Sequence, residues 1–233
     1  MRLLLLSNST NFGSAYLDHA IAEVKEFFGS AKRLAFVPFA LKDREAYTNK
    51  AKARLQRDGF GVAGLTPDAA GRAALERADG VFVGGGNTFR LLKTLQDSGL
   101  IEILRRRVGE GMPYMGASAG TNIAAPTIRT TNDMPIVEPK GFDALGAVPF
   151  QINPHFLDAD PSAQHMGETR EDRLREFLEE NDRVVVGLRE GSWLRREDGT
   201  LRLGGARAAR IFRRGAEPEE AEPGAVLDRL LVV

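Results

Sequence analysis

The sequence predicts an α/β protein with a mainly parallel sheet sandwiched between helices, followed by a C-terminal β-hairpin. Short apolar runs without clear alternation, which are typical of strands buried on both faces, alternate with segments whose apolar residues have helical spacing. Such strand–helix alternation predicts parallel strands covered by helices. After Leu188 the alternation stops, and an Asp-Gly pair, a strong signal for a tight hairpin turn, favours two antiparallel strands.

The elements follow from these patterns in chain order. The expected strands of the main sheet are Leu3–Leu6, Leu34–Val37, Gly80–Val83, Pro113–Met115 and Val184–Leu188. The expected helices are Ala15–Phe28, Arg44–Arg57, Ala69–Ala78, Thr88–Asp97, Leu100–Val108 and Thr169–Glu180. The hairpin is expected at Ser192–Arg196 and Leu201–Leu203 around Asp198-Gly199, with a further short strand at Ala208–Arg213, an acidic surface loop at Gly215–Gly224 and an apolar segment at Ala225–Val233.

Length and charge restrict the organisation and the partners of the chain. The 233 residues contain no internal repeat or long linker, so we expect a single domain over residues 1–233. Lys plus Arg and Asp plus Glu both number 32, which gives a formal net charge of zero. This balance argues against nucleic-acid binding, because neutralising phosphates needs a surplus of clustered cations. The sequence predicts no particular oligomeric state.

The chain has no cysteine, which excludes disulfides, Cys-ligated metal sites and cysteine nucleophiles. No cluster of His and acidic residues has metal-ligand spacing, so we expect neither a metal nor another cofactor. The run Leu3–Leu6 is too short for the core of a secretion signal, and no stretch approaches the length of a membrane span. We therefore expect a cytoplasmic protein without membrane contact.

Gly84-Gly85-Gly86-Asn87-Thr88 follows an expected strand and opens a helix. Glycines permit close backbone approach, and Asn87 or Thr88 can cap the helix. The backbone N–H groups at such a helix start suit an anion or a developing oxyanion. The spacing matches neither of the two common nucleotide-binding glycine motifs, so a glycine-rich turn without a ligand is an equal alternative.

Gly116-Ala117-Ser118-Ala119-Gly120 matches the pattern G-x-S-x-G between an expected strand and a short helix, Thr121–Ala125. This strand–turn–helix context is typical of a nucleophile elbow, in which small flanking residues permit a sharp turn that exposes the serine hydroxyl. The N–H of Ala119 would then donate to an oxyanion. We therefore favour Ser118 as a nucleophile over a plain small-residue turn.

A serine nucleophile needs a base, and the chain offers three histidines. His19 is expected on a helix surface and His165 in a polar surface loop. His155 lies in Ile152-Asn153-Pro154-His155-Phe156, where a strand-like run ends. Because sites form at the carboxyl edge of open α/β sheets, His155 is the favoured base.

Two carboxylates compete to orient the histidine. Asp133 lies in a polar loop, Arg129–Pro135, and Glu190 follows the expected strand Val184–Leu188. Glu190 is at the sheet edge, and Gly191 lets the chain turn after it. Asp133 could instead organise the loop that lines the pocket, so both stay candidates.

These segments together resemble the aspartyl dipeptidase (peptidase E) family of serine peptidases. The resemblance spans roughly residues 1–212, with an unmatched C-terminal tail. It is carried by LLLLSNST (3–10), VGGGNTF (83–89), SAGTN (118–122), PTIRTTNDMPIV (126–137), GFDAL (141–145), QINPHF (151–156), GETRE (167–171) and GLREGSW (187–193). Ala117 departs from the tryptophan of bacterial members.

The resemblance implies a flavodoxin-like fold of the class I glutamine amidotransferase type and a cytoplasmic enzyme that cleaves dipeptides with an N-terminal aspartate. Ser118 would be the nucleophile and His155 the base. The family's orienting carboxylate falls on Glu190, which we favour, although an aspartate assigned to the triad in the family falls on Asp133. The oxyanion would be bound by the N–H groups of Ala119 and Gly86.

Recognition of an aspartyl side chain requires a fixed cation, and Arg170 is the first candidate because a guanidinium binds a carboxylate in bidentate fashion. Glu168 could pair with the free α-amino group, and Asn87 is a further candidate for substrate binding. Glu168 and Arg170 could equally be ordinary charges at a helix start.

Three alternatives stay open. An esterase of the α/β-hydrolase type also uses G-x-S-x-G, but the interval between Ser118 and Asp133 is short for that fold. A cyanophycinase-like peptidase for β-aspartyl-arginine is a closer relative, against which the TNDMPIV loop argues. A binding module could use Gly84–Gly86 for an anionic ligand without catalysis.

Overall fold

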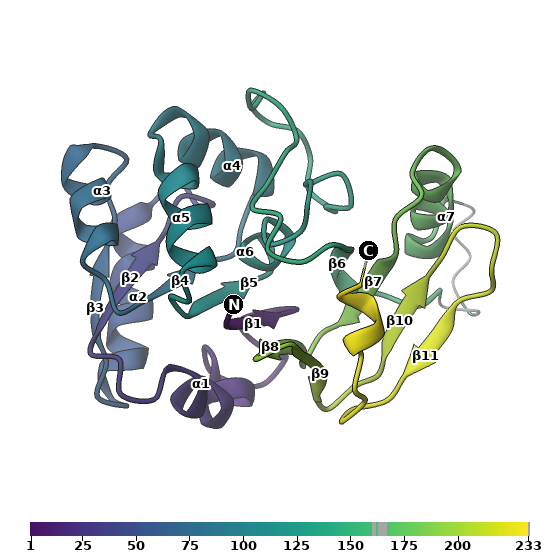
Figure 1. The fold of residues 1–233 in the computed structure, drawn as a ribbon, viewed down its shortest axis with the longest axis horizontal. Coiled ribbons are helices and arrows are strands. Elements are labelled where there is room, and N and C mark those ends of the chain that lie inside the picture. The colour runs from purple at the N-terminus through teal and green to yellow at the C-terminus, as the bar shows by residue number, and fades with distance from the viewer. Residues whose placement is uncertain (160–161, 163–166, 233) are drawn as a thin grey trace.

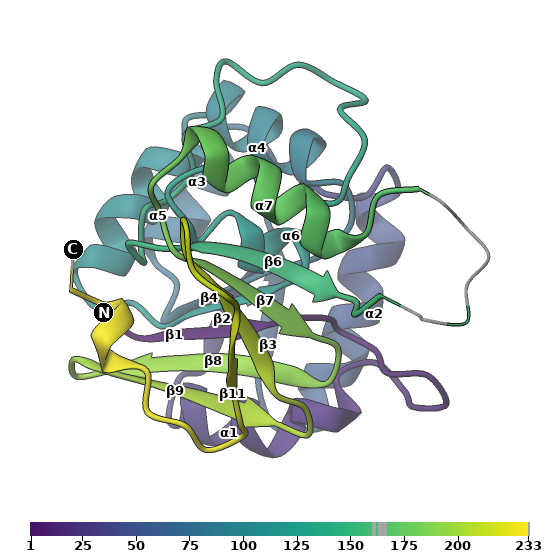
Figure 2. The same ribbon diagram turned by 90° about the vertical axis from the view of Figure 1, so that its right-hand side faces the viewer.

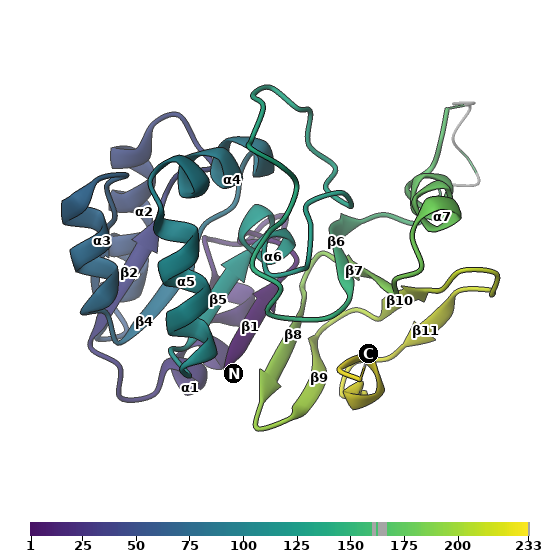
Figure 3. The ribbon, with the colours of Figure 1, turned by 45° about the horizontal axis from the view of Figure 1, so that its top comes forward.

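The structure, a computed structural model, describes residues 1–159, 162 and 167–232. A seven-stranded sheet has the order β3-β2-β4-β5-β1-β8-β9. Figure 3 shows most of these strands following one another across the molecule. The strands are β1 (Leu3–Leu6), β2 (Arg33–Val37), β3 (Gly61–Gly64), β4 (Gly80–Val83), β5 (Tyr114–Ala117), β8 (Ser192–Glu197) and β9 (Thr200–Gly205). The first five pair in parallel, as predicted for all of them except β3, and β8 joins β1 antiparallel.

Helices cover both faces of this sheet (Figure 1). Leu4 and Leu6 of β1 pack in one core with α1 (Ile21–Phe28) and α2 (Arg44–Gln56). Leu3 and Leu5 point to the opposite face, where they share a second core with α3 (Ala69–Glu76), α4 (Thr88–Asp97) and α5 (Leu100–Gly109). Successive side chains of a strand alternate between faces, so a fully apolar run is what a strand buried on both sides needs. The predicted sandwich is confirmed.

The hairpin is also confirmed. Strands β8 and β9 pair antiparallel from Ser192 with Gly205 to Glu197 with Thr200. Asp198 and Gly199 both have positive φ, at 49° and 84°, as the tight turn that matches strand twist requires.

A second, four-stranded sheet has the order β11-β10-β7-β6. Its strands are β6 (Gln151–Phe156), β7 (Val185–Arg189), β10 (Ala209–Phe212) and β11 (Glu219–Ala221). Strand β7 is parallel to β6 and antiparallel to β10. Helix α7 (Arg170–Glu180) packs through Leu174 and Leu178 against one face. Figure 2 shows α7 lying beside β6.

The prediction that placed Val184–Leu188 in the main sheet is wrong. The run forms β7 of the second sheet, because an apolar run specifies burial but not the partner strand.

Two local predictions also need correction, and one strand was not predicted. The expected acidic loop Gly215–Gly224 contains β11, an edge strand that pairs with β10 and exposes two of its three residues. The expected helix Ala15–Phe28 is divided into a 3-10 turn (Asp18–Ala20) and α1, since Leu17 has φ 63°. Strand β3 gave no signal, because only Val62 of its four residues is buried. A further 3-10 turn, Asp228–Leu230, lies near the C-terminus.

In the described part of the chain, no helix is long and apolar enough to cross a membrane.

Candidate active site

The candidate residues gather where the strands of both sheets end. Ser7 follows β1, Gly84 follows β4 and Ser118 follows β5, and these three strands are parallel neighbours. In the second sheet, His155 lies near the end of β6, and Glu190 follows β7. The ends enclose a cleft of about 560 Å³. This volume is within the range typical of small-ligand sites.

Ser118 lies on a sharp turn between β5 and α6 (Ala119–Asn122), with φ 54° and ψ −111°. A non-glycine residue in such a conformation costs about 1–3 kcal/mol and is common at active sites. The two glycines of the motif make the turn possible. A Cβ on Gly116 would lie 2.4 Å from the Gly120 carbonyl oxygen, and one on Gly120 would lie 2.1 Å from that of Val83. The motif therefore forms the elbow that its pattern predicts.

Ser118, His155 and Glu190 form a chain of hydrogen bonds. His155 Nε2 lies 2.9 Å from Ser118 Oγ, and His155 Nδ1 lies 2.6 Å from Glu190 Oε1. The side chains of His155 and Glu190 are 38% and 46% exposed, so solvent reaches the outer half of the chain. With Nδ1 protonated and donating to Glu190, Nε2 is left to accept the Ser118 proton.

Asp133 does not contact His155. Its Oδ2 accepts from Thr88 N at 2.7 Å, Thr88 Oγ1 at 2.6 Å and Thr131 Oγ1 at 3.1 Å. The carboxylate therefore lies at the first turn of α4, where a negative charge is stabilised by the helix dipole. Asp133 also lines the cleft that contains Ser118.

The backbone of the glycine loop leaves one amide available beside Ser118. Gly84 N donates to Val37 O, Gly85 N to Tyr47 Oη and Asn87 N to Ala40 O. In the described residues, Gly86 N and Ala119 N have no protein acceptor, and both residues line the cleft. A Cβ on Gly85 would lie 2.9 Å from Ser118 Cβ, so only glycine lets the loop approach this closely.

The three predicted substrate-binding residues have different surroundings. Arg170 is half-buried at the start of α7 and lines the cleft. Burial and the charge of Arg173 lower the pKa of its guanidinium below the usual value, and the charge of Asp133 offsets only part of this. Within the described ranges, neither ion pair nor hydrogen bond engages Arg170. Glu168 instead pairs with Arg173 at 3.4 Å on a neighbouring hollow. Asn87 caps α4, accepting from Arg90 N and donating to Met134 O.

Two residues after β1 hold the ends of β6 and β7, although the sequence reasoning did not single them out. Ser7, fully buried, donates to Leu188 O at 2.7 Å and accepts from His155 N at 2.9 Å. His155 has φ 54°, so this bond supports a strained backbone. Asn8 Oδ1 accepts from Gly191 N at 2.9 Å. The sequence signal that could have identified Ser7 and Asn8 is the polar run Ser7–Thr10, which directly follows the buried strand Leu3–Leu6.

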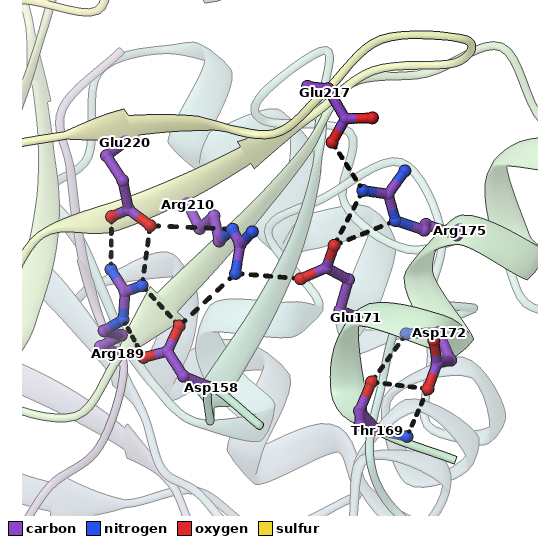
Figure 4. A network of polar contacts seen from close by, with 9 residues as sticks. All are labelled: Asp158, Thr169, Glu171, Asp172, Arg175, Arg189, Arg210, Glu217 and Glu220. Carbon is purple, nitrogen blue, oxygen red and sulfur yellow. Dashed lines mark hydrogen bonds and ion pairs between the residues drawn. The ribbon is translucent and has the colours of Figure 1, made fainter. Parts of the chain in front are cut away.

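A charged network holds the elements of the second sheet together (Figure 4). Arg189, which precedes Glu190, binds Asp158 and Glu220 through four contacts of 2.7–2.9 Å. Arg210 lies 2.9 Å from Glu171, the neighbour of Arg170, and 3.7 Å from both Asp158 and Glu220. The network thus joins β7, which ends next to Glu190, to α7, which begins at Arg170, and to Asp158, which follows the strand containing His155.

His19, the other histidine in the described part of the chain, makes no hydrogen bond with Ser118. His19 lies in the 3-10 turn beside Trp193, with ring centroids 6.5 Å apart, and burial lowers its pKa. The ring nitrogens of His19 are buried, contrary to the expected surface position. His165, expected in a surface loop, lies outside the described residues. Among the described residues, no group of three or more His, Asp or Glu side chains is arranged to hold a metal ion.

Comparisons of the sequence and of the fold with known proteins all find peptidases. The model of peptidase family S51 matches residues 3–204. A Streptomyces coelicolor protein named peptidase E is 58% identical over 233 residues, covering 100% of this chain and 96% of its own, so the C-terminal tail is matched too. A Drosophila melanogaster protein named probable alpha-aspartyl dipeptidase is 45% identical, covering 98% and 97%. A peptidase structure from an acI-B1 Actinobacterium has a TM-score of 0.71 at 16% identity, covering 97% and 96%, which supports the fold.

Proposed function

The chain belongs to peptidase family S51, and we propose that it is a serine dipeptidase that hydrolyses dipeptides with an N-terminal aspartate. The observation that carries this proposal is the 2.9 Å contact between Ser118 Oγ and His155 Nε2 on a strained elbow. A hydroxyl in hydrogen-bond contact with a neutral imidazole nitrogen is the arrangement that activates a serine for acyl transfer.

The reaction begins when Ser118 Oγ attacks the carbonyl carbon of the aspartyl residue and its proton moves to His155 Nε2. Glu190, 2.6 Å from Nδ1, stabilises the positive imidazolium that forms. Asp133, whose Oδ2 binds Thr88 and Thr131, is not suited to this task. We therefore assign the orienting carboxylate to Glu190.

The attack converts the carbonyl oxygen to an oxyanion, which Gly86 N and Ala119 N would bind. The absence of a protein acceptor for either amide within the described ranges supports this role. Collapse of the intermediate breaks the C–N bond, and His155 returns its proton to the leaving amine. Water then attacks the aspartyl-enzyme ester, His155 accepts the proton from water and passes it to Ser118 Oγ, and free aspartate is released.

Selection of aspartate rests on Arg170, which we propose binds the substrate's side-chain carboxylate. Arg170 is a half-buried cation without a partner in the described structure, and it faces the cleft that contains Ser118. A partly desolvated guanidinium without a counterion favours an anionic ligand. The substrate partner is thus a small acidic peptide. The cytoplasmic location and the single-domain organisation stay predictions.

The test is hydrolysis of Asp-Leu, Ala-Leu, β-Asp-Arg and p-nitrophenyl acetate by wild type, Ser118→Ala and Arg170→Gln. We expect Ser118→Ala to reduce turnover of Asp-Leu by at least about 10⁴-fold, as loss of a triad serine does. Arg170→Gln should lower the preference for Asp-Leu over Ala-Leu. Turnover of only the ester or only β-Asp-Arg would contradict the proposed substrate. Turnover of Asp-Leu by Ser118→Ala at the wild-type rate would contradict the mechanism.

A further inference from the structure

We propose that Asp133 binds the free α-ammonium group of the substrate and thereby restricts hydrolysis to an N-terminal aspartate. This inference rests on the proposed function and adds the group that reads the amino terminus. It gives Asp133 a role distinct from that of Glu190, which contacts His155.

Within the described residues, the carboxylate of Asp133 is held through one oxygen. Its three hydrogen bonds there, from Thr88 N, Thr88 Oγ1 and Thr131 Oγ1, go to Oδ2. In the described ranges, Oδ1 has no hydrogen-bond partner, although the residue is only partly exposed. A carboxylate can accept hydrogen bonds at both oxygens, so Asp133 is oriented but keeps acceptor capacity. Because the residue lines the cleft, a ligand there can use that capacity.

The position of Asp133 relative to Arg170 fits the aspartyl residue. In that residue, the ammonium is on Cα and the carboxylate on Cβ, so the groups that bind them must be adjacent and opposite in charge. Asp133 and Arg170 line the same cleft, yet they form no ion pair with each other. Each can therefore pair with the substrate group of opposite charge.

No other carboxylate of the described structure competes for the ammonium in the cleft. Asp133 carries the only carboxylate among the described residues that line it. Glu190 is hydrogen-bonded to His155, and Glu168 pairs with Arg173 on the neighbouring hollow. The earlier expectation that Glu168 binds the α-amino group is thus less well supported than a role for Asp133.

Succinyl-Leu provides a direct test, because it is Asp-Leu with hydrogen in place of the ammonium group. We expect wild type to prefer Asp-Leu by about 10- to 150-fold in kcat/KM, the usual range for a hydrogen bond to a charged group. Asp133→Asn keeps the size and an oxygen for Thr88 but removes the charge. It should lower kcat/KM for Asp-Leu by a similar factor and bring the ratio between the two substrates close to one.

If Asp133 had a purely structural role, or were the orienting acid, Asp133→Asn would lower kcat/KM for Asp-Leu and for succinyl-Leu by the same factor. The ratio between the two substrates would then stay as in wild type, and this result would overturn the proposal. Glu168→Gln is measured alongside, and a collapse of the ratio in that variant but not in Asp133→Asn would also overturn it. Glu138→Gln removes an exposed charge from the same loop outside the cleft and controls for long-range electrostatics.

A measurement on wild type covers the case in which Asp133→Asn does not fold. L-Aspartate and succinate, compared as competitive inhibitors, differ by the same ammonium group. Inhibition at least about tenfold tighter by L-aspartate supports the proposal, and equal inhibition overturns it. If wild type cleaves Asp-Leu and succinyl-Leu equally, this inference fails while the dipeptidase function stands. If it cleaves no aspartyl dipeptide, the proposed function fails.

Discussion

Replacing Glu190 by Gln tests the proposed orienting acid with little change in shape. Glu190 Oε1 lies 2.6 Å from His155 Nδ1, and the substitution keeps an oxygen that can accept this hydrogen bond. It removes the negative charge that would stabilise the imidazolium, and the amide can also turn its NH₂ group toward the ring. The rate of the chemical step should fall, while the fold and substrate binding should change little.

The size of the effect follows from the bond and its exposure. A hydrogen bond to a charged group contributes about 1.5–3 kcal/mol, and about 1.4 kcal/mol in the barrier changes the rate tenfold. We therefore expect Glu190→Gln to lower kcat by about 10- to 150-fold. This is less than the loss of about 10⁴ found where a buried triad acid is amidated. The His155 and Glu190 side chains are 38% and 46% exposed, so water shares in stabilising the imidazolium.

The assay is steady-state hydrolysis of Asp-Leu with kcat and KM measured separately. Glu190→Asp keeps the charge but shortens the side chain, and its kcat should lie between those of wild type and Glu190→Gln. Glu138→Gln serves as the control for removal of an exposed acid. A decrease of kcat by less than about threefold in Glu190→Gln would be too small for the loss of a charged hydrogen bond. This result would refute the assignment of Glu190 as the orienting acid.

Three further changes test the supports of the site and the surface electrostatics. Ser7→Ala removes the hydrogen bonds of the Ser7 hydroxyl with Leu188 O and His155 N and should lower the free energy of unfolding by about 1–3 kcal/mol, as urea denaturation would show, together with kcat. In Gly85→Ala, the new methyl group would lie 2.9 Å from Ser118 Cβ, so kcat should fall about 100-fold or more with an unchanged circular dichroism spectrum, and an active variant would contradict the required approach. Hydrogen bonds from Arg33 lower the pKa of Asp79 from 3.8 to about 2, so the stability that its charge adds is present above the unfolded-state pKa and lost as the pH falls toward 2. Asp79→Asn should therefore unfold more easily than wild type at pH 6 but not at pH 2, and an equal difference at both values would contradict this assignment.

The sequence by itself determined the central parallel layer and the elbow. Strand β1 is apolar and buried at all four positions. An apolar run without alternation is typical of a strand buried on both faces, so Leu3–Leu6 could be recognised as a strand without knowledge of its neighbours. The signal for the elbow was also local. Gly116 is needed because its Cα lies close to the Gly120 carbonyl, and Gly120 is needed because its Cα lies close to the Val83 carbonyl. Local constraints of this kind are encoded within a few residues, so pattern reasoning can find them.

Only the tertiary structure decided which residues meet across the two sheets. The choice between Glu190 and Asp133 stayed open because hydrogen bonding depends on a distance of about 3 Å, which sequence spacing does not fix. In the fold, Glu190 contacts His155, whereas Asp133 accepts a hydrogen bond from Thr88 at the start of α4. The second sheet was missed for the same reason, since pairing partners are set by long-range packing. Ser7, 148 positions before His155, illustrates this: its hydroxyl gains a partner only when β1 and β6 are brought together.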